Sequence, residues 1–289
     1  MREYVVFTDN TADLPADYLS KNGVEKLFLN YTIDGQTYDQ TNELPVQEFY
    51  EKMRGGSMPT TSQINPENAR EAFMQKVKEG YDILYIAFSS GLSGSCGSAQ
   101  IAANQIMEEM PEVKILVVDS LCASLGEGLL VHKVLKKKAE GATLEEAAAY
   151  AEEMKMKICH NFTVDDLFHL YRGGRVSRAT AIVGSLAGIK PVLHVDDEGH
   201  LIPIGKVRGR KKSLHALVER MQKQIKGYEA DNDVVFISHG DCIEDAQYVA
   251  NKVKELCGID AFLINYVGST IGAHSGPGTA ALFFVGSPR

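Results

Sequence analysis

The sequence predicts an α/β protein with a largely parallel, helix-flanked sheet in its first half and a mixed or antiparallel sheet in its second half. As far as residue 158, short apolar runs alternate with amphipathic stretches of about 10 to 15 residues, the pattern of βαβ units. Beyond it, PVLHVDDEGHLIPIGKV (191–207) places two apolar runs around Asp197-Glu198-Gly199, which is typical of a β-hairpin. We therefore expect a domain over 1–158 and another over 159–289.

The individual elements follow from local patterns. Asn65 followed by Pro66 combines a cap residue with a first-turn proline, which predicts a helix running to Gly80. Thr143 and Glu146 have the spacing of a capping box and predict a second helix. A third is expected over 93–107. The apolar runs predict strands at 3–8, 25–30, 82–88, 113–119, 158–164, 190–195, 233–238, 260–267 and 281–286.

Composition narrows the function classes. The 289 residues are 44% hydrophobic and 24% charged, as in a soluble globular protein, and the net charge of −8 argues against nucleic acid as a partner. No run reaches the ~18 apolar residues of a membrane span, and MREYVVFTDN has no signal-peptide pattern. The five cysteines show no CxxC pair and no metal-ligand spacing. We expect reduced thiols in a cytoplasmic protein without a metal or cofactor.

The serine- and glycine-rich turn FSSGLSGSCGSAQ (88–100) joins an apolar run to a helical stretch. A hydrolase elbow needs G-x-S-x-G, but Ser95 replaces the last glycine, and the chain has no Walker loop. A helix N-terminus offers unpaired N–H groups and partial positive charge. Glycines such as Gly94 would let an anion approach, and Ser93 or Ser95 could donate to it. Alternatively, one of these serines simply caps its own helix.

Other polar segments have equally ordinary alternatives. PTTSQINP (59–66) precedes a helix start, and His274 lies in a glycine-rich turn before an apolar strand. The basic turn YRGGRVSR (171–178) and the basic island KVRGRKKS (206–213) are compatible with solvated faces or with a docking patch.

Several of these segments occur together, and in this combination the chain resembles the DegV family over essentially its whole length. One departure is visible: Cys96-Gly97 stands where relatives usually have an aromatic and a polar residue. The motifs that carry the resemblance are VVFTDNTADLP (5–15), PTTSQINP (59–66), SSGLSGSCGSA (89–99), LYRGGRVS (170–177), IKPVL (189–193) and HSGPGTAALFFVG (274–286).

The resemblance implies a two-domain DegV-like protein that holds one long-chain fatty acid between its domains. It implies that Thr61 or Ser62, Ser93 with Gly94, and His274 bind the carboxylate. In the better-studied bacterial members, a separate kinase subunit phosphorylates that carboxylate to give acyl phosphate for phospholipid synthesis, so the binding subunit is not itself an enzyme.

The tail would need a long apolar tunnel. At ~0.8 kcal/mol per buried CH₂, about sixteen carbons would gain on the order of 10 kcal/mol before ordering costs. The small-residue apolar stretch ATAIVGSLAGI (179–189) is a candidate wall, with Ile182, Leu186 and Ile189 facing the tail, or else it packs on the sheet alone.

The basic segments suggest where a kinase would dock. Arg172, Arg208 and Arg210 are the candidates, because they cluster in turns. Two further functions stay open: an acyl hydrolase using Ser93 and His274, and a binding module for another anionic small molecule.

Overall fold

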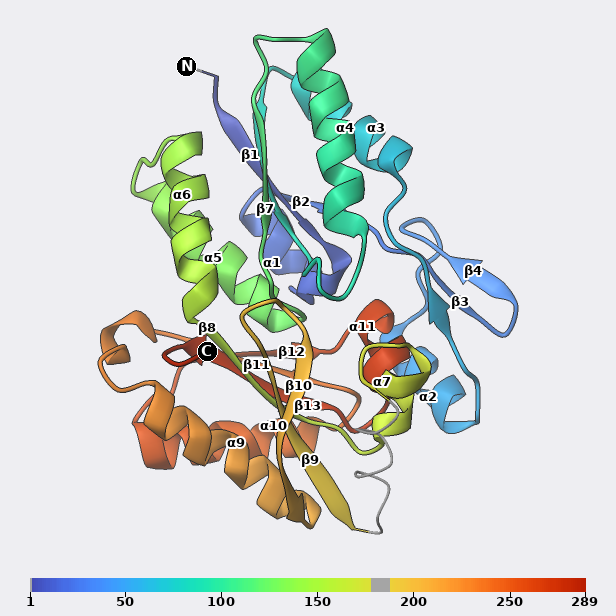
Figure 1. The fold of residues 1–289 in the computed structure, drawn as a ribbon, viewed down its shortest axis with the longest axis vertical. Coiled ribbons are helices and arrows are strands. Elements are labelled where there is room, and N and C mark those ends of the chain that lie inside the picture. The colour runs from blue at the N-terminus through green and yellow to red at the C-terminus, as the bar shows by residue number, and fades with distance from the viewer. Residues whose placement is uncertain (1, 178–187) are drawn as a thin grey trace.

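The computed structural model describes residues 2–177 and 188–289, and their strands form three sheets (Figure 1). The first sheet has the order β2-β1-β6-β7, and all its strands are parallel. Its members are β1 (Tyr4–Asp9), β2 (Val24–Leu27), β6 (Asp82–Ala87) and β7 (Ile115–Asp119). The parallel sheet predicted for the first half is thereby confirmed.

The second sheet is mixed, as predicted, with the order β10-β9-β8-β13-β11-β12. Only β11 and β12 pair in parallel, and the predicted hairpin is β9–β10, in which Leu201 pairs with Val195. Its members are β8 (Ile158–Thr163), β9 (Ile189–Val195), β10 (Leu201–Arg208), β11 (Val235–His239), β12 (Phe262–Tyr266) and β13 (Ala280–Val285). The division into domains at residue 158 stays a prediction, although it falls where this sheet begins.

A third, small sheet was not predicted from the sequence. It consists of β3 (Tyr31–Ile33), β4 (Gln36–Tyr38) and β5 (Thr60–Thr61), strands too short to show an alternating pattern. With α2 (Val46–Arg54), it packs on α11 (Ser269–Ser275) through a cluster that includes Tyr31, Phe49 and Ala273. Residues of the first half therefore cover a helix of the second half.

The predicted helix starts at 65–66 and 143 are confirmed by their caps. The Asn65 side chain accepts a hydrogen bond from the Glu67 N–H at 2.9 Å, and Thr143 and Glu146 form the capping box. The helix expected from 93 begins at Ser95, with Gly94 as its cap residue. The remaining bounds are α1 (Ala16–Lys21), α3 (Pro66–Lys78), α4 (Ser95–Glu109), α5 (Leu125–Ala139), α6 (Leu144–Met154), α7 (Leu167–Arg172), α9 (Arg210–Gln224) and α10 (Ile243–Cys257).

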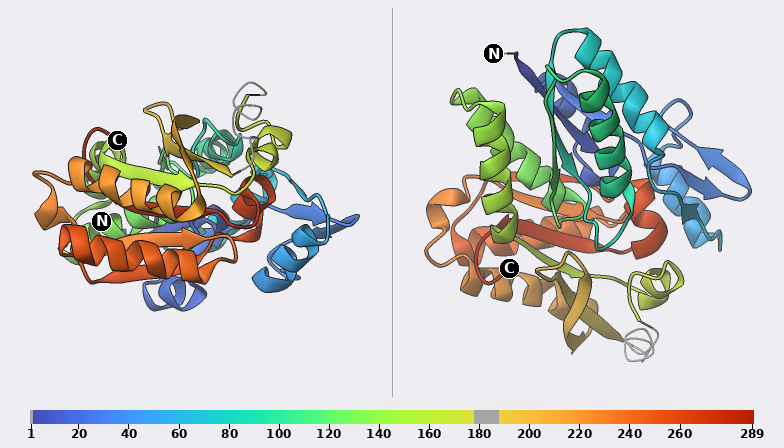
Figure 2. Two further views of the ribbon diagram at one scale, coloured as in Figure 1. Left: turned by 90° about the horizontal axis from the view of Figure 1, so that it is seen from below. Right: turned by 45° about the horizontal axis from the view of Figure 1, so that its top comes forward.

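The helices form layers around the two large sheets. Helices α3 and α4 lie side by side against the first sheet, and α9 and α10 lie side by side against the second (Figure 2). Helix α5 lies between the sheets (Figure 1), and one hydrophobic cluster joins Leu84 of the first sheet, Leu129 of α5 and Phe283 of the second. The carboxyl ends of the parallel strands thus face the second sheet, which is where ligands of open α/β sheets bind.

A buried acidic pair lies at the carboxyl end of β1. Asp9 accepts hydrogen bonds from the Phe88 N–H at 2.7 Å and from the Tyr85 hydroxyl. Glu127 of α5 accepts from Thr8 at 2.9 Å and from Thr11 at 3.0 Å. Burial raises the pKa of Asp9 to about 7. Burial and the charge of Asp9 raise the pKa of Glu127 well above its usual range.

Glu127→Gln should make the stability of the protein less sensitive to rising pH. A carboxyl with a raised folded-state pKa keeps a proton that the unfolded chain releases, so its stabilisation is complete below pH ~4 and is lost as pH rises through the folded-state pKa. Urea unfolding at pH 5 and pH 8 measures this loss. We expect the variant to lose less free energy of unfolding over that interval, by on the order of 1 kcal/mol. The exposed control Glu140→Gln should behave as wild type, and an unchanged loss in Glu127→Gln would contradict the assignment.

Candidate functional site

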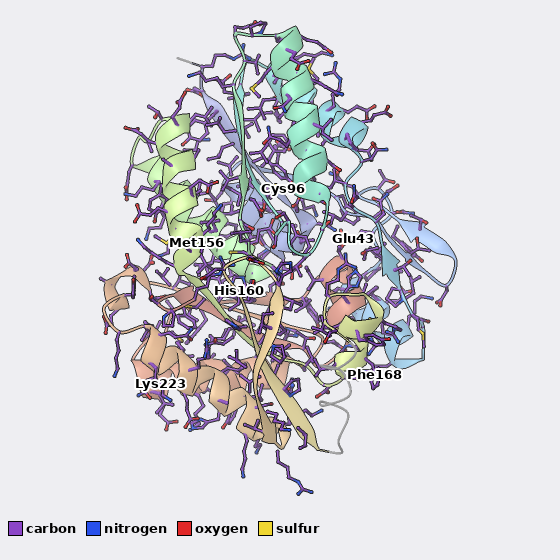
Figure 3. The ribbon with its side chains drawn as sticks, viewed as in Figure 1. Glu43, Cys96, Met156, His160, Phe168 and Lys223 are labelled. Carbon is purple, nitrogen blue, oxygen red and sulfur yellow. The ribbon has the colours of Figure 1, made fainter. Side chains whose placement is uncertain are left out.

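A cavity of about 270 Å³ lies between the carboxyl edge of the first sheet and one face of the second. His160 of β8, which lines it, lies between the two sheets in Figure 3. Most of the wall is apolar and comes from both halves of the chain. The apolar wall residues are Leu29, Phe88, Leu92, Ala123, Phe162, Leu170, Val195, Leu201, Val267, Ile271, Ala281 and Phe283.

Hydroxyl and imidazole groups gather at one part of this cavity. Thr61 Oγ1 and His274 Nε2 lie 2.7 Å apart, at hydrogen-bond distance, and join β5 to α11. Ser62, Ser93 and Gly94 also line the cavity. The structure therefore brings together all five residues that the sequence analysis proposed for a carboxylate, from three segments that are far apart in the chain.

The two serines of the turn have different roles. Ser95 is buried, and its Oγ accepts a hydrogen bond from the Ile64 N–H at 3.1 Å, so it fixes the 59–66 loop. Ser93 Oγ lies 2.9 Å from Ser95 Oγ and borders the cavity. A Cβ on Gly94 would come within 2.2 Å of Gln63 Oε1, so the absence of a side chain lets the two loops touch. The residue left to meet a ligand is Ser93.

The β9–β10 hairpin closes onto the same serine-glycine turn. Ser89 is buried, and its hydroxyl donates to the Gly199 carbonyl at 2.9 Å. A Cβ on Gly91 would lie 2.7 Å from the Glu198 carbonyl oxygen, so backbone meets backbone here. This contact holds Leu201 of the hairpin over the cavity.

His274 is neutral at pH 7 in this environment. Burial, followed by the positive charges of Arg175 and Arg172, lowers its pKa to about 4. Its Nδ1 is buried and lacks a hydrogen-bond partner among the described residues, so no carboxylate orients the ring. Since His274 bonds to Thr61 and Ser93 bonds to Ser95, the arrangement differs from a Ser–His–acid triad.

Arg175 is a site residue that the sequence analysis assigned only to a basic turn. It is half-buried, lines the cavity, and donates from Nε and Nη2 to the Leu92 carbonyl at 3.1 and 2.8 Å. It thereby fixes the peptide that precedes Ser93. The sequence signal that could have singled out Arg175 was its place in the motif LYRGGRVS. Its charge alone does not distinguish it from the other arginines of the basic turn.

The residues expected to line a tail tunnel are placed only in part. Ile182 and Leu186 lie outside the described residues. Ile189 is half-buried at the start of β9 and pairs with Arg208, and the cavity walls formed by residues 2–177 and 188–289 do not include it.

The candidate docking arginines have different surroundings. Arg172 at the end of α7 and Arg208 at the end of β10 are exposed. Arg210 is half-buried at the start of α9, where it pairs with Asp245 at 2.8 Å and donates to the Gly278 carbonyl at 2.5 Å. Arg210 therefore already stabilises this end of the second sheet.

Within 2–177 and 188–289, no three His, Cys, Asp or Glu side chains are placed to share a metal ion. All five cysteines are free. The described helices include none that is both long and apolar enough to span a bilayer.

Comparison with known proteins identifies the family. Residues 3–287 match the family described as "Uncharacterised protein, DegV family". A DegV domain-containing protein of Clostridium perfringens is 43% identical over 100% of this chain and 99% of its own length. Another, from Lactococcus lactis, is 36% identical over 98% of this chain and 97% of its own. The chain belongs to the DegV family.

Solved structures of the family share the fold. A DegV family protein of Thermus thermophilus, described by its fatty acid binding, superposes with a TM-score of 0.85 at 29% identity, covering 99% of this chain and 100% of that one. DegV of Bacillus subtilis, described as a fatty acid binding protein, gives 0.84 at 28% identity with the same coverage. A fatty acid binding DegV family protein of Streptococcus agalactiae gives 0.83 at 30% identity, again with the same coverage. The α/β fold predicted for this chain is confirmed by these structures.

Gly91→Ala should destabilise the protein, because its Cβ would push the hairpin backbone away from the serine-glycine turn. We expect a cost of about 1–3 kcal/mol in urea unfolding. Gly97→Ala is the matched control: Gly97 lies in α4, and a Cβ there meets no heavy atom within 4 Å. Alanine should leave stability unchanged or raise it by up to ~1 kcal/mol. Equal effects of the two substitutions would refute the backbone contact.

Proposed function

We propose that this protein binds one long-chain fatty acid in the cavity between its sheets and is not itself an enzyme. The main support is the pairing of an apolar cavity with the Thr61–His274–Ser93 group at one part of its wall. The related DegV structures described as fatty acid binding add to this support.

The carboxylate would meet a suitable set of donors. The first turn of α4 has N–H groups without intrahelical partners and carries partial positive charge. The hydroxyls of Ser93, Thr61 and Ser62 add donors close to it. A bound carboxylate would also raise the pKa of His274 above its low value of about 4, because a nearby negative charge favours the cation. Head-group binding is therefore expected to strengthen as pH falls through the His274 pKa of the complex.

The tail would supply most of the affinity. Twelve apolar side chains line the described part of the cavity, and each buried CH₂ contributes ~0.8 kcal/mol. A carboxylate without a long chain would bind weakly at this site, because its own hydrogen bonds only replace those it makes with water.

We further propose that the bound carboxylate is presented to a separate kinase for acyl phosphate formation in a bacterial cytoplasm, feeding phospholipid synthesis. Ser62 and Gly94 border the cavity and are exposed, so this end of the ligand would be reachable from outside. The chain has no phosphate-binding loop of its own for a nucleotide. The exposed Arg172 and Arg208 are the better docking candidates, since Arg210 is engaged with Asp245.

Thr61→Ala combined with Ser93→Ala should weaken fatty acid binding by about 10- to 100-fold, because two hydrogen bonds to a charged group are lost. Native mass spectrometry and displacement of a fluorescent fatty acid measure the change. Ser90→Ala is the control, since Ser90 lies in the same turn without lining the cavity. Unchanged lipid occupancy in the folded double variant would contradict the head-group assignment, and a wild type that never carries lipid would contradict the function.

Arg172→Glu combined with Arg208→Glu should reduce the coupling to the kinase of the same host by roughly tenfold, because charge reversal turns attraction into repulsion. The fatty acid content should stay at the wild-type level. Pull-down with the kinase and acyl phosphate formation measure the coupling. Lys78→Glu reverses an exposed charge on α3 and serves as the control. If the kinase binds all three proteins equally, these arginines do not form the docking surface.

A further inference from the structure

A chain of three buried polar side chains reaches the cavity from the side of α5. Ser124 Oγ lies 2.5 Å from Asp13 Oδ2 and 2.8 Å from Ser238 Oγ. Asp13 Oδ1 accepts from the Gly268 N–H at 2.9 Å. All three side chains are at least nine-tenths buried, and Ser124 and Ser238 line the cavity. These groups have no part in the carboxylate site described above.

The position of Ser124 indicates that this contact is not incidental. Ser124 is the N-cap residue of α5, yet its hydroxyl makes no capping hydrogen bond and donates to Asp13 instead. Its φ of 54° lies in the left-handed region, which costs a residue with a side chain on the order of 1 kcal/mol or more. The backbone is thus held in an unfavourable conformation that directs the hydroxyl toward Asp13 and Ser238.

The direction of these hydrogen bonds determines whether Ser238 presents a donor or an acceptor to a ligand in the cavity. When Asp13 is ionised, its carboxylate can only accept, so Ser124 donates its single proton to Asp13. Ser238 then donates its proton to Ser124, and the lone pairs of Ser238 Oγ are acceptors at the cavity wall. An alkyl chain passing this oxygen gives it no partner, whereas a hydroxyl on that chain would donate to it.

Ser275 provides an independent observation. Its hydroxyl is buried to the same degree and lines the cavity, and it has no hydrogen-bond partner among the described residues. Buried hydroxyls are normally paired, so this atom indicates that a polar group of a ligand or water completes it. Ser238 and Ser275 therefore place two hydroxyls with unused hydrogen-bonding capacity beside the apolar side chains of the cavity wall.

The two hydroxyls differ in their relation to the head-group site. Asp13 bonds to Gly268, which precedes α11, whereas His274 lies near the end of that helix. Gly268 and His274 are six residues apart, about 9 Å along a helix. Ser275 directly follows His274. With the carboxylate at His274, Ser275 would lie beside the head group, whereas the Asp13–Ser124–Ser238 chain starts at the other end of α11.

We propose that the cavity accepts an acyl chain that carries a hydroxyl group, with Ser238 or, beside His274, Ser275 hydrogen-bonding to that hydroxyl according to its position along the chain. The inference rests on the proposed fatty acid binding and deepens it, because it names hydroxylated long-chain acids as a ligand class. Ser238 is then a specificity-determining residue, and Asp13 and Ser124 are positioning residues that orient its proton.

Competitive native mass spectrometry can test this, since one oxygen atom separates the two ligand masses. Delipidated protein is mixed with equal amounts of stearic acid and a monohydroxystearic acid at pH 8. At this pH Asp13 is mostly the carboxylate, because burial raises its pKa to about 7. A series of hydroxyl positions along the chain is used. The ratio of hydroxylated to plain acid bound is compared among wild type, Ser238→Ala and Ser275→Ala. Ser213→Ala, which removes a buried hydroxyl outside the cavity, is the control.

For at least one hydroxyl position, we expect Ser238→Ala to lower the ratio about fivefold, the effect of one neutral hydrogen bond. Ser275→Ala should lower it in the same direction, while Ser213→Ala leaves it unchanged and plain stearic acid binds all four proteins. A ratio that neither Ser238→Ala nor Ser275→Ala changes at any position would overturn the inference and leave fatty acid binding standing. A wild type that retains neither acid would instead refute the proposed function, and the inference with it.

Discussion

The candidate site depends on the contact of the serine-glycine turn (88–100) with the 59–66 loop and the β9–β10 hairpin. Three hydrogen bonds define it, between Ser95 and Ile64, Gln63 and Ser98, and Ser89 and Gly199. A fourth, between Thr61 and His274, joins the 59–66 loop to α11. Together they join the carboxyl edge of the parallel sheet to the 59–66 loop, the β9–β10 hairpin and α11. Without them the cavity would have walls on one side only. Gly91 makes the contact with the hairpin possible, since a Cβ there would meet the backbone of Glu198 and Gly199, and Gly94 leaves room for the Gln63 side chain.

The interior around the cavity is arranged so that few groups are charged. Burial raises the pKa values of Asp9, Asp13 and Glu127 and lowers those of His160 and His274. Each shift favours the neutral form, because desolvation penalises charge. The positive charge of the half-buried Arg175 lowers the pKa of His274 more than that of Arg172 does. In such surroundings the carboxylate of a ligand would be the dominant charge. Its hydrogen bonds would be stronger than in water, because the local dielectric constant is low.

The hydrogen bonds around Ser93 and His274 also distinguish a binding site from the active site of a hydrolase. Nucleophilic catalysis needs a serine bonded to a histidine that an acid orients. Here the histidine bonds to Thr61, the serine bonds to a second serine, and the free nitrogen of the imidazole has no acidic partner among the described residues. The hydrogen bonds of Ser93 and His274 therefore differ from those of a catalytic triad, which is compatible with the proposed binding function.

The sequence by itself determined much of the fold and pointed to residues that line one cavity, the candidate head-group site. Apolar runs placed nine of the ten strands described for the two large sheets, and the hairpin signal placed the tenth, β10. Caps placed the helix starts at Pro66 and Leu144, because these signals are local. The motifs around Thr61, Ser93 and His274 were recognisable because each lies within a few residues. Tertiary structure alone decided the small β3–β5 sheet, whose strands have two or three residues, and the role of Arg175. It also decided the Asp13–Ser124–Ser238 chain, whose members lie more than 100 residues apart. Such contacts form only when separate elements pack, so no local pattern in the chain records them.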